Sequence, residues 1–163
     1  MVVPRKYAIV FLLVIAGGVA FFMYNKYRVA PNLDVEHLTL KNPDGSIVNS
    51  NDFRGKTLFV NYWATWCGEC LREMPSIESA YRQSDPNDVI FLMITDDPPE
   101  KINAFLAKHN YPMKFVYVEE RLQELGINTI PTTYIFDDEG YELFNHVGGL
   151  DWSDPGLVGL LKK

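Results

Sequence analysis

Hydrophobic residues occur in runs of two lengths along this chain, and the two lengths predict different elements. Residues 7–24 carry no charge, and a helix over this run covers about 27 Å, close to the thickness of a membrane's hydrocarbon core. The apolar runs at 58–63 and 89–95 are shorter and rich in β-branched and aromatic residues, which is typical of buried strands. The pattern therefore predicts one long N-terminal helix and, after it, a domain with a buried sheet.

The first predicted strand leads into a predicted helix. After a short connection at 64–66, apolar residues recur three or four positions apart, as expected on one face of a helix: Leu71, Met74, Ile77 and Tyr81. Two cysteines, Cys67 and Cys70, stand at the start of this helix. The order is therefore strand, turn, thiol pair and helix.

A second helix is expected after the strand at 89–95. Asp97 is predicted to be its N-cap, Pro98 its first residue and Glu100 the partner of Asp97 in a capping box. Strands and helices that alternate in this way predict parallel neighbouring strands in an α/β fold.

The remaining elements are predicted to be short. We expect a strand at 115–118, a helix at 119–125 ended by Gly126, an antiparallel hairpin of strands at 132–136 and 141–147, and a last helix at 155–161. Near the N-terminus, the turn residues at 42–45 predict a β-hairpin between 35–40 and 46–48. The predicted fold is a mixed central sheet with helices on both faces.

The long apolar run divides the chain into two predicted parts. Residues 1–28 are expected to be a membrane anchor with a transmembrane helix at about 7–24, and residues 29–163 a single domain. The small triplet at 18–20 could be a signal-peptide cleavage site, but the apolar run continues beyond it. This continuation favours an anchor that is retained, with a cleaved signal peptide as the alternative.

The charge balance excludes one large class of partner. The chain has 15 Lys and Arg against 21 Asp and Glu, a net charge of −6. Four of the basic residues flank the N-terminal run, so from residue 29 onward 11 basic residues stand against 21 acidic ones, a balance of −10. Such a surface repels phosphate backbones, and nucleic acid is therefore not expected as a partner.

The only two cysteines in the chain suit redox chemistry. A thiolate on Cys67 would lie at the first helical turn, where unpaired N–H groups and the helix dipole lower its pKa. Cys70, one turn further along and more enclosed, can close a small disulfide ring. We therefore expect Cys67 to attack and Cys70 to resolve. A zinc site would need a second ligand pair, and His37, His109 and His146 share no metal-binding spacing.

The string WATWCGECLREMP at 63–75 resembles the thioredoxin superfamily and, within it, the membrane-anchored TlpA/ResA-like group. The resemblance implies a thioredoxin fold and an extracytoplasmic thiol-disulfide oxidoreductase that needs no cofactor. It also implies a cis bond before Pro131, facing the thiols, with the backbone of Ile130 free to pair with an extended substrate. Trp66 is then the expected substrate contact, and Trp63 is expected to lie partly at the rim of the site.

The same resemblance implies partners for the domain. The TlpA/ResA-like group includes proteins of cytochrome c maturation, so the haem-binding cysteine pair of an apocytochrome c is the expected substrate. A membrane electron carrier of the DsbD or CcdA type is the expected reductant. Both partners would meet the domain on the periplasmic or outer side of the cytoplasmic membrane.

Glu73 is the third candidate catalytic residue. It lies one helical turn beyond Cys70, a spacing that also fits a solvated charge beside Arg72. TlpA/ResA-like proteins have a Glu at this place that is linked to thiol proton transfer. Asn61 stands where many thioredoxins have a buried Asp, and since an amide cannot accept a proton, Glu73 is the nearest candidate base. Negative charge from Glu69 and Glu73 disfavours the thiolate, which predicts a reducing protein.

Three other functions are alternatives for the same pair of cysteines. A general periplasmic disulfide reductase or isomerase would use the same thiols. A copper metallochaperone could hold Cu(I) between them, with Met113 or a histidine as a further ligand. A peroxidase shares the fold, but the residues before Cys67 do not match its Pro-x-x-x-Thr/Ser-x-x-Cys setting.

Overall fold

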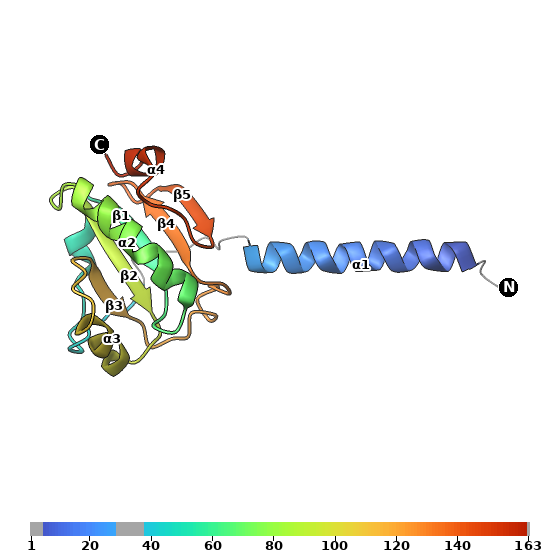
Figure 1. Cartoon of the computed structure of the whole chain (residues 1–163), viewed down its shortest axis with the longest axis horizontal. Helices are drawn as coiled ribbons and strands as arrows, with labels where there is room; N and C mark the ends of the chain where they lie inside the picture. Colours follow the sequence, from blue (N-terminus) through green and yellow to red (C-terminus); the bar gives the residue numbers. More distant parts are fainter. Residues whose placement is uncertain (1–4, 29–37, 163) are drawn as a thin grey trace.

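The computed structural model describes residues 5–28 and 38–162, and in the N-terminal helix it describes the side chains of residues 10–23. This helix, α1 (Arg5–Arg28), contains the predicted run (Figure 1). Its described side chains are all exposed. Within the described part of the chain, no helix combines the length and the hydrophobicity that a membrane crossing requires.

The domain is built on a mixed sheet of five strands in the order β3-β2-β1-β4-β5 (Figure 1). The first three strands are parallel, β4 is antiparallel to β1, and β5 is antiparallel to β4. Every residue of β1 and β4 is buried, which explains why neither strand contains a charged residue. The strands are β1 (Thr57–Tyr62), β2 (Val89–Thr95), β3 (Lys114–Tyr117), β4 (Thr132–Phe136) and β5 (Glu142–Val147).

Three α-helices cover one face of this sheet. They are α2 (Gly68–Gln83), α3 (Pro99–Leu106) and α4 (Pro155–Gly159). Their buried side chains join one hydrophobic cluster with residues from the strands, among them Phe59, Phe91 and Ile135. This layer holds the thiol pair, because Cys67 and Cys70 belong to the same cluster.

The opposite face has its own hydrophobic cluster but no α-helix among its described residues. It is covered by the short 3-10 helix η2 (Ser50–Phe53) and by turns. The helix predicted at 119–125 is wrong, since this segment forms successive turns. Only Leu122 and Leu125 are apolar there, too few to offset the cost of nucleating a helix. Helices were predicted on both faces of the sheet, and among the described residues the helix on this face is the short η2.

The predicted N-terminal β-hairpin is reduced to its turn. Gly45 N–H donates to Asn42 O over 2.8 Å, and among the described residues the pairing across the turn amounts to a single β-bridge between Lys41 and Ile47. Residues 35–37 lie outside the described residues. Side chains in the turn bond to one another, as Ser46 Oγ does to Asp44 Oδ1, and this local bonding competes with a strand ladder.

Candidate active site

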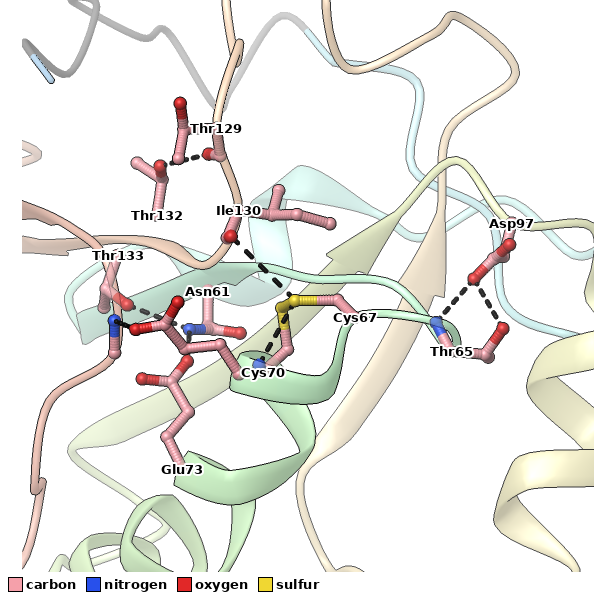
Figure 2. Close-up of a disulfide and its surroundings, with 12 residues drawn as sticks. Asn61, Thr65, Cys67, Cys70, Glu73, Asp97, Thr129, Ile130, Thr132 and Thr133 are labelled. Carbon is pink, nitrogen blue, oxygen red and sulfur yellow. Dashed lines mark hydrogen bonds between the residues drawn. A yellow bond between two sulfur atoms is a disulfide. The ribbon is translucent and has the colours of Figure 1, made fainter. Parts of the chain in front are cut away.

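The two cysteines lie at the N-terminal end of α2 and form a disulfide (Figure 2). Cys67 is the N-cap residue of α2, and its Sγ accepts a hydrogen bond from Cys70 N–H over 3.2 Å. The predicted place of this sulfur at a helix N-terminus is therefore confirmed. Cys67 is 7 % exposed and Cys70 is 0 % exposed, so Cys67 is the more accessible of the two.

The peptide bond between Ile130 and Pro131 is cis, as the resemblance implied. Cys67 Sγ lies 3.9 Å from Ile130 O, so the loop before β4 faces the disulfide (Figure 2). A disulfide sulfur carries no hydrogen, but a Cys67 thiol could donate to this carbonyl oxygen. Pro131 O accepts a hydrogen bond from Gly148 N–H over 2.8 Å, which fixes the loop against the end of β5.

The two tryptophans before the disulfide have different surroundings. Trp66 is 69 % exposed, so its ring is available to a partner next to Cys67. Trp63 is fully buried and packs against Phe105 and Phe115. The expectation that Trp63 lies partly at the rim of the site is wrong, because the ring fills the core between the sheet and α3.

Glu73 is 4 % exposed, which excludes the alternative of a solvated charge beside Arg72. Its Oε1 accepts from Asn61 Nδ2 over 2.8 Å, and its Oε2 accepts from Leu150 N–H over 3.2 Å and from Trp152 Nε1 over 3.3 Å. Burial raises the pKa of Glu73 to about 7, although these three donors oppose the shift. Near neutral pH such a carboxyl can both take up and release a proton.

The model of the Redoxin family matches residues 28–161, which is most of the chain. The chain belongs to the Redoxin family. The thiol-disulfide oxidoreductase ResA of Bacillus thuringiensis is 26% identical to it over 172 residues, covering 96% of this chain and 94% of the relative. ResA of Geobacillus thermodenitrificans is 29% identical over 144 residues, covering 85% of this chain and 82% of the relative.

A solved structure gives the same fold for this Redoxin-family chain. The exposed lipoprotein thioredoxin Etrx1 of Streptococcus pneumoniae matches with a TM-score of 0.62 at 22% identity, covering 74% of this chain and 95% of that protein. Family match, relatives and fold together identify a ResA/TlpA-like member of the thioredoxin superfamily, as the motif predicted. With its Cys67–Cys70 pair, the chain is a thiol-disulfide oxidoreductase.

Three residues of the site are not among those predicted from the sequence: Gly149, Leu150 and Trp152. Gly149 N–H donates to Glu69 Oε1 over 3.2 Å, while Leu150 and Trp152 donate to Glu73. A Cβ at Gly149 would lie 3.1 Å from Glu69 Cγ, so a glycine fits this approach. The paired glycines before a lone tryptophan were the available signal.

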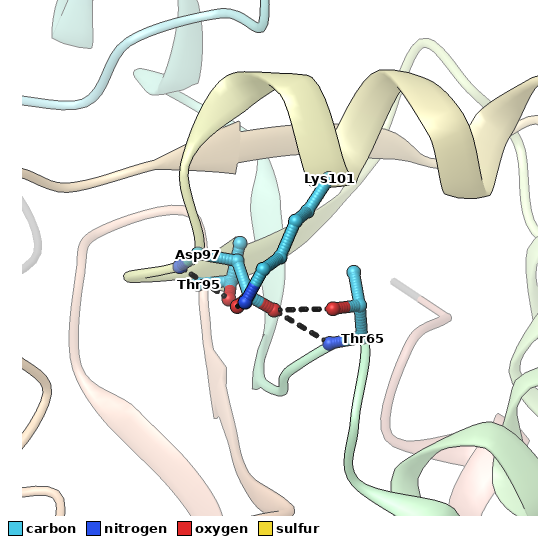
Figure 3. Close-up of polar contacts among 4 residues, drawn as sticks. All are labelled: Thr65, Thr95, Asp97 and Lys101. Carbon is cyan, nitrogen blue, oxygen red and sulfur yellow. Dashed lines mark hydrogen bonds and ion pairs between the residues drawn. The ribbon is translucent and has the colours of Figure 1, made fainter.

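Asp97 is not the N-cap of α3, so the predicted capping box with Glu100 is wrong. The N-cap is Pro98, and the helix begins at Pro99. The carboxylate of Asp97 turns instead toward Thr65, whose N–H and Oγ1 both donate to Asp97 Oδ2 (Figure 3). The hydrogen-bond donors to this carboxylate thus come from the loop before Cys67 and not from the N-terminal N–H groups of α3.

The histidines have neighbours typical of packing residues. Among the described residues, no group of three or more His, Cys, Asp or Glu side chains is placed to hold a metal ion. The ring of His109 packs tilted against that of Phe105, with centroids 4.7 Å apart, and the ring centroid of His146 lies 6.4 Å from that of Phe144 on β5. His37 lies outside the described residues.

Proposed function

We propose that this chain reduces disulfide bonds of partner proteins on the outer side of the cytoplasmic membrane, to which α1 anchors it. The observation that carries the proposal is the position of Cys67 Sγ, at the N-terminus of α2 and 3.9 Å from the carbonyl oxygen that precedes the cis proline. One sulfur is thereby stabilised as a thiolate and placed beside a backbone segment that a substrate can pair with.

In the first step, the Cys67 thiolate of the reduced protein attacks one sulfur of a substrate disulfide. The substrate disulfide breaks, a mixed disulfide forms between Cys67 and the substrate, and the other substrate sulfur leaves as a thiolate. The exposed ring of Trp66 and the backbone of Ile130 are the proposed substrate contacts, because both border Cys67.

In the second step, Cys70 gives its proton to the Glu73 carboxylate and attacks Cys67 Sγ. The mixed disulfide breaks, the Cys67–Cys70 disulfide forms, and the second substrate sulfur leaves as a thiolate. Two electrons have then passed from the enzyme to the substrate. Glu73 lines a surface groove of about 530 Å³ together with Ser76 and Asp151, which offers its proton a route to solvent or to the leaving thiolate.

The proposed substrate is the haem-binding Cys-x-x-Cys-His pair of an apocytochrome c in its oxidised form. The proposed source of electrons is a membrane carrier of the DsbD or CcdA type, which would return the enzyme disulfide to two thiols. The TlpA/ResA-like character of the chain supports both proposals, as does the negative charge of Glu69, which favours the reducing direction.

The proposed anchor rests on the character of α1. The described side chains at 10–23 are exposed, and most are large and apolar around the whole helix. A helix that is hydrophobic on all sides needs an apolar environment, either a protein core or a membrane. The uncharged run at 7–24 lies within α1 (Arg5–Arg28) and covers about 27 Å as a helix, just under the hydrocarbon thickness of about 30 Å.

Trapping of the mixed disulfide tests this function. In the native host, full-length Cys70→Ser should accumulate disulfide-linked adducts through Cys67, and these should be recovered from the membrane fraction. The control is the double variant Cys67→Ser/Cys70→Ser, which should form none. A lack of adducts would contradict the reductase mechanism, adducts only in the soluble fraction would contradict the anchor, and trapped proteins without Cys-x-x-Cys-His would contradict the substrate.

A further inference from the structure

We propose that Asp97 is a positioning residue of the thiol pair: by binding Thr65, it holds Cys67 at the N-terminus of α2. The inference deepens the proposed function and rests on its assignment of Cys67 as the attacking sulfur. Asp97 lies in the loop between β2 and α3, and Thr65 lies in the loop between β1 and α2. One carboxylate therefore joins the loops that follow two adjacent parallel strands.

The contacts of Asp97 are those of a fixed side chain. It is 5 % exposed, and its Oδ2 accepts from Thr65 N–H over 2.7 Å and from Thr65 Oγ1 over 2.9 Å (Figure 3). Its own N–H donates to Thr95 Oγ1 over 3.1 Å, and Lys101 Nζ lies 3.6 Å from its Oδ1. Hydrogen bonds to an ionised acceptor are about twice as strong as neutral ones, so this link is a strong one.

Thr65 is the middle of the segment that this link would hold. On one side Trp63 N–H donates to Ile94 O over 3.0 Å, and on the other Cys67 N–H donates to Ala64 O over 3.1 Å. Thr65 itself donates two hydrogen bonds, from its N–H and its Oγ1, and both go to Asp97 Oδ2. The conformation of the turn that ends at Cys67 therefore depends on this carboxylate.

The position of Cys67 decides how strongly its thiolate is stabilised. The sulfur accepts Cys70 N–H because Cys67 adopts the extended N-cap conformation, with φ −82° and ψ 100°. If Thr65 were released, the sulfur would leave the helix end for part of the time. The pKa of the Cys67 thiol would then rise toward the free value of about 8.5.

A direct electrostatic role of Asp97 would have the opposite sign. A nearby carboxylate disfavours the thiolate, so removal of its charge alone would lower the pKa of Cys67. Asp97→Ala removes both the charge and the acceptor, whereas Asp97→Asn removes the charge and keeps an acceptor oxygen for Thr65. The two variants together therefore separate positioning from charge.

The test is the pH dependence of Cys67 alkylation by iodoacetamide in the reduced, full-length protein, with the modified peptide identified by mass spectrometry. We expect Asp97→Ala to raise the apparent pKa of Cys67 by about one unit, or about tenfold less thiolate below both pKa values, and Asp97→Asn not to raise it. The control is Asp96→Ala, which removes a neighbouring carboxylate that accepts a hydrogen bond from Leu122 N–H. This variant should not raise the pKa of Cys67 either.

An unchanged or lowered pKa in Asp97→Ala would overturn the proposal, as would an equal rise in Asp97→Asn. If Asp97→Ala does not fold, Thr65→Val takes its place, because it removes the hydroxyl bond and keeps the N–H. A smaller rise in the pKa of Cys67 is then expected, and no rise would overturn the proposal. Alkylation needs no substrate, so this result is independent of whether the trapping experiment supports the proposed function.

Discussion

Two buried carboxylates, Glu73 and Asp97, belong to the surroundings of the thiol pair, and they differ in the groups that they bind. Glu73 projects from α2 itself, one turn beyond Cys70, while Asp97 reaches the other side from the loop before α3. Their exposures are similar, 4 % and 5 %. Burial alone therefore does not distinguish them, and the difference lies in their partners.

The donors to Glu73 come from separate parts of the chain and are neutral. They are an amide on β1, a backbone N–H and an indole N–H. Asp97 instead receives both groups of one residue, Thr65, and has a cation 3.6 Å away on its other oxygen. Neutral donors do not offset the burial of Glu73, which raises its pKa to about 7. Such a group is suited to proton exchange, whereas the bonding of Asp97 is suited to holding a loop.

The comparison predicts its largest effect for Glu73→Gln, on the rate at which substrate is released. Without the base, Cys70 should be deprotonated more slowly, and release of substrate from the mixed disulfide at pH 7 should slow by about 100-fold. The pH dependence of Cys67 alkylation should not move to higher pH, in contrast to Asp97→Ala, because Glu73 does not hold the loop before Cys67. Stopped-flow measurement of single-turnover reduction of an oxidised Cys-x-x-Cys-His peptide gives both steps.

A matched control for this variant is Glu78→Gln, on the same helix, where the carboxylate pairs with Arg82 at the surface. It should release substrate at the rate of the unchanged protein. Equal release rates for Glu73→Gln and Glu78→Gln would contradict the proposal that Glu73 is the base. Glu73 and Asp97 would then not differ in the way described above.

The second effect is on stability and follows from the raised pKa of Glu73. Its pKa is about 7 in the folded protein against 4.5 ordinarily, so the folded state binds this proton more tightly. The stabilisation that this bound proton gives is full below pH 4.5 and is lost as the pH rises through 7. The free energy of unfolding should therefore fall by about 3 kcal/mol over this range. Urea unfolding of the oxidised protein at pH 5 and pH 8 measures it.

Glu73→Gln isolates this contribution from the other titrating groups. The fall in unfolding free energy between pH 5 and pH 8 should be smaller in the variant than in the unchanged protein by most of that amount. If the two proteins lose the same stability over this range, Glu73 does not retain a proton in the folded state near neutral pH.

The elements that carry the site were predictable because their signals are local. The strands at 89–95 and 132–136 have their predicted bounds, the first from its continuous apolar run and the second from its place in a predicted hairpin. The N-terminus of α2 was predictable from Cys67 and the apolar spacing that follows it. The thiol pair and its helix therefore followed from neighbouring residues alone.

The partners of the two carboxylates were not predictable, because they are distant in the sequence. Asp97 fitted a capping box with Glu100, yet its partner Thr65 is 32 residues away. Glu73 is held by Leu150 and Trp152, 77 and 79 residues further along. The pairing of distant segments depends on the folded sheet, so sequence spacing indicated which carboxylates could matter but not what they bind.

The smallest effect concerns Lys101, the cation near Asp97. Its side chain is 58% exposed and Nζ lies 3.6 Å from Asp97 Oδ1, so Lys101→Met should lower the free energy of unfolding by less than about 1 kcal/mol, and less still at high salt. It should also leave the pH dependence of Cys67 alkylation nearly unchanged, because the bonds to Thr65 remain. Urea unfolding at low and high salt measures the first effect. A loss as large as that of Asp97→Ala would mean that the ion pair, and not Thr65, fixes the carboxylate, and the contrast between Asp97 and Glu73 would then be one of charge.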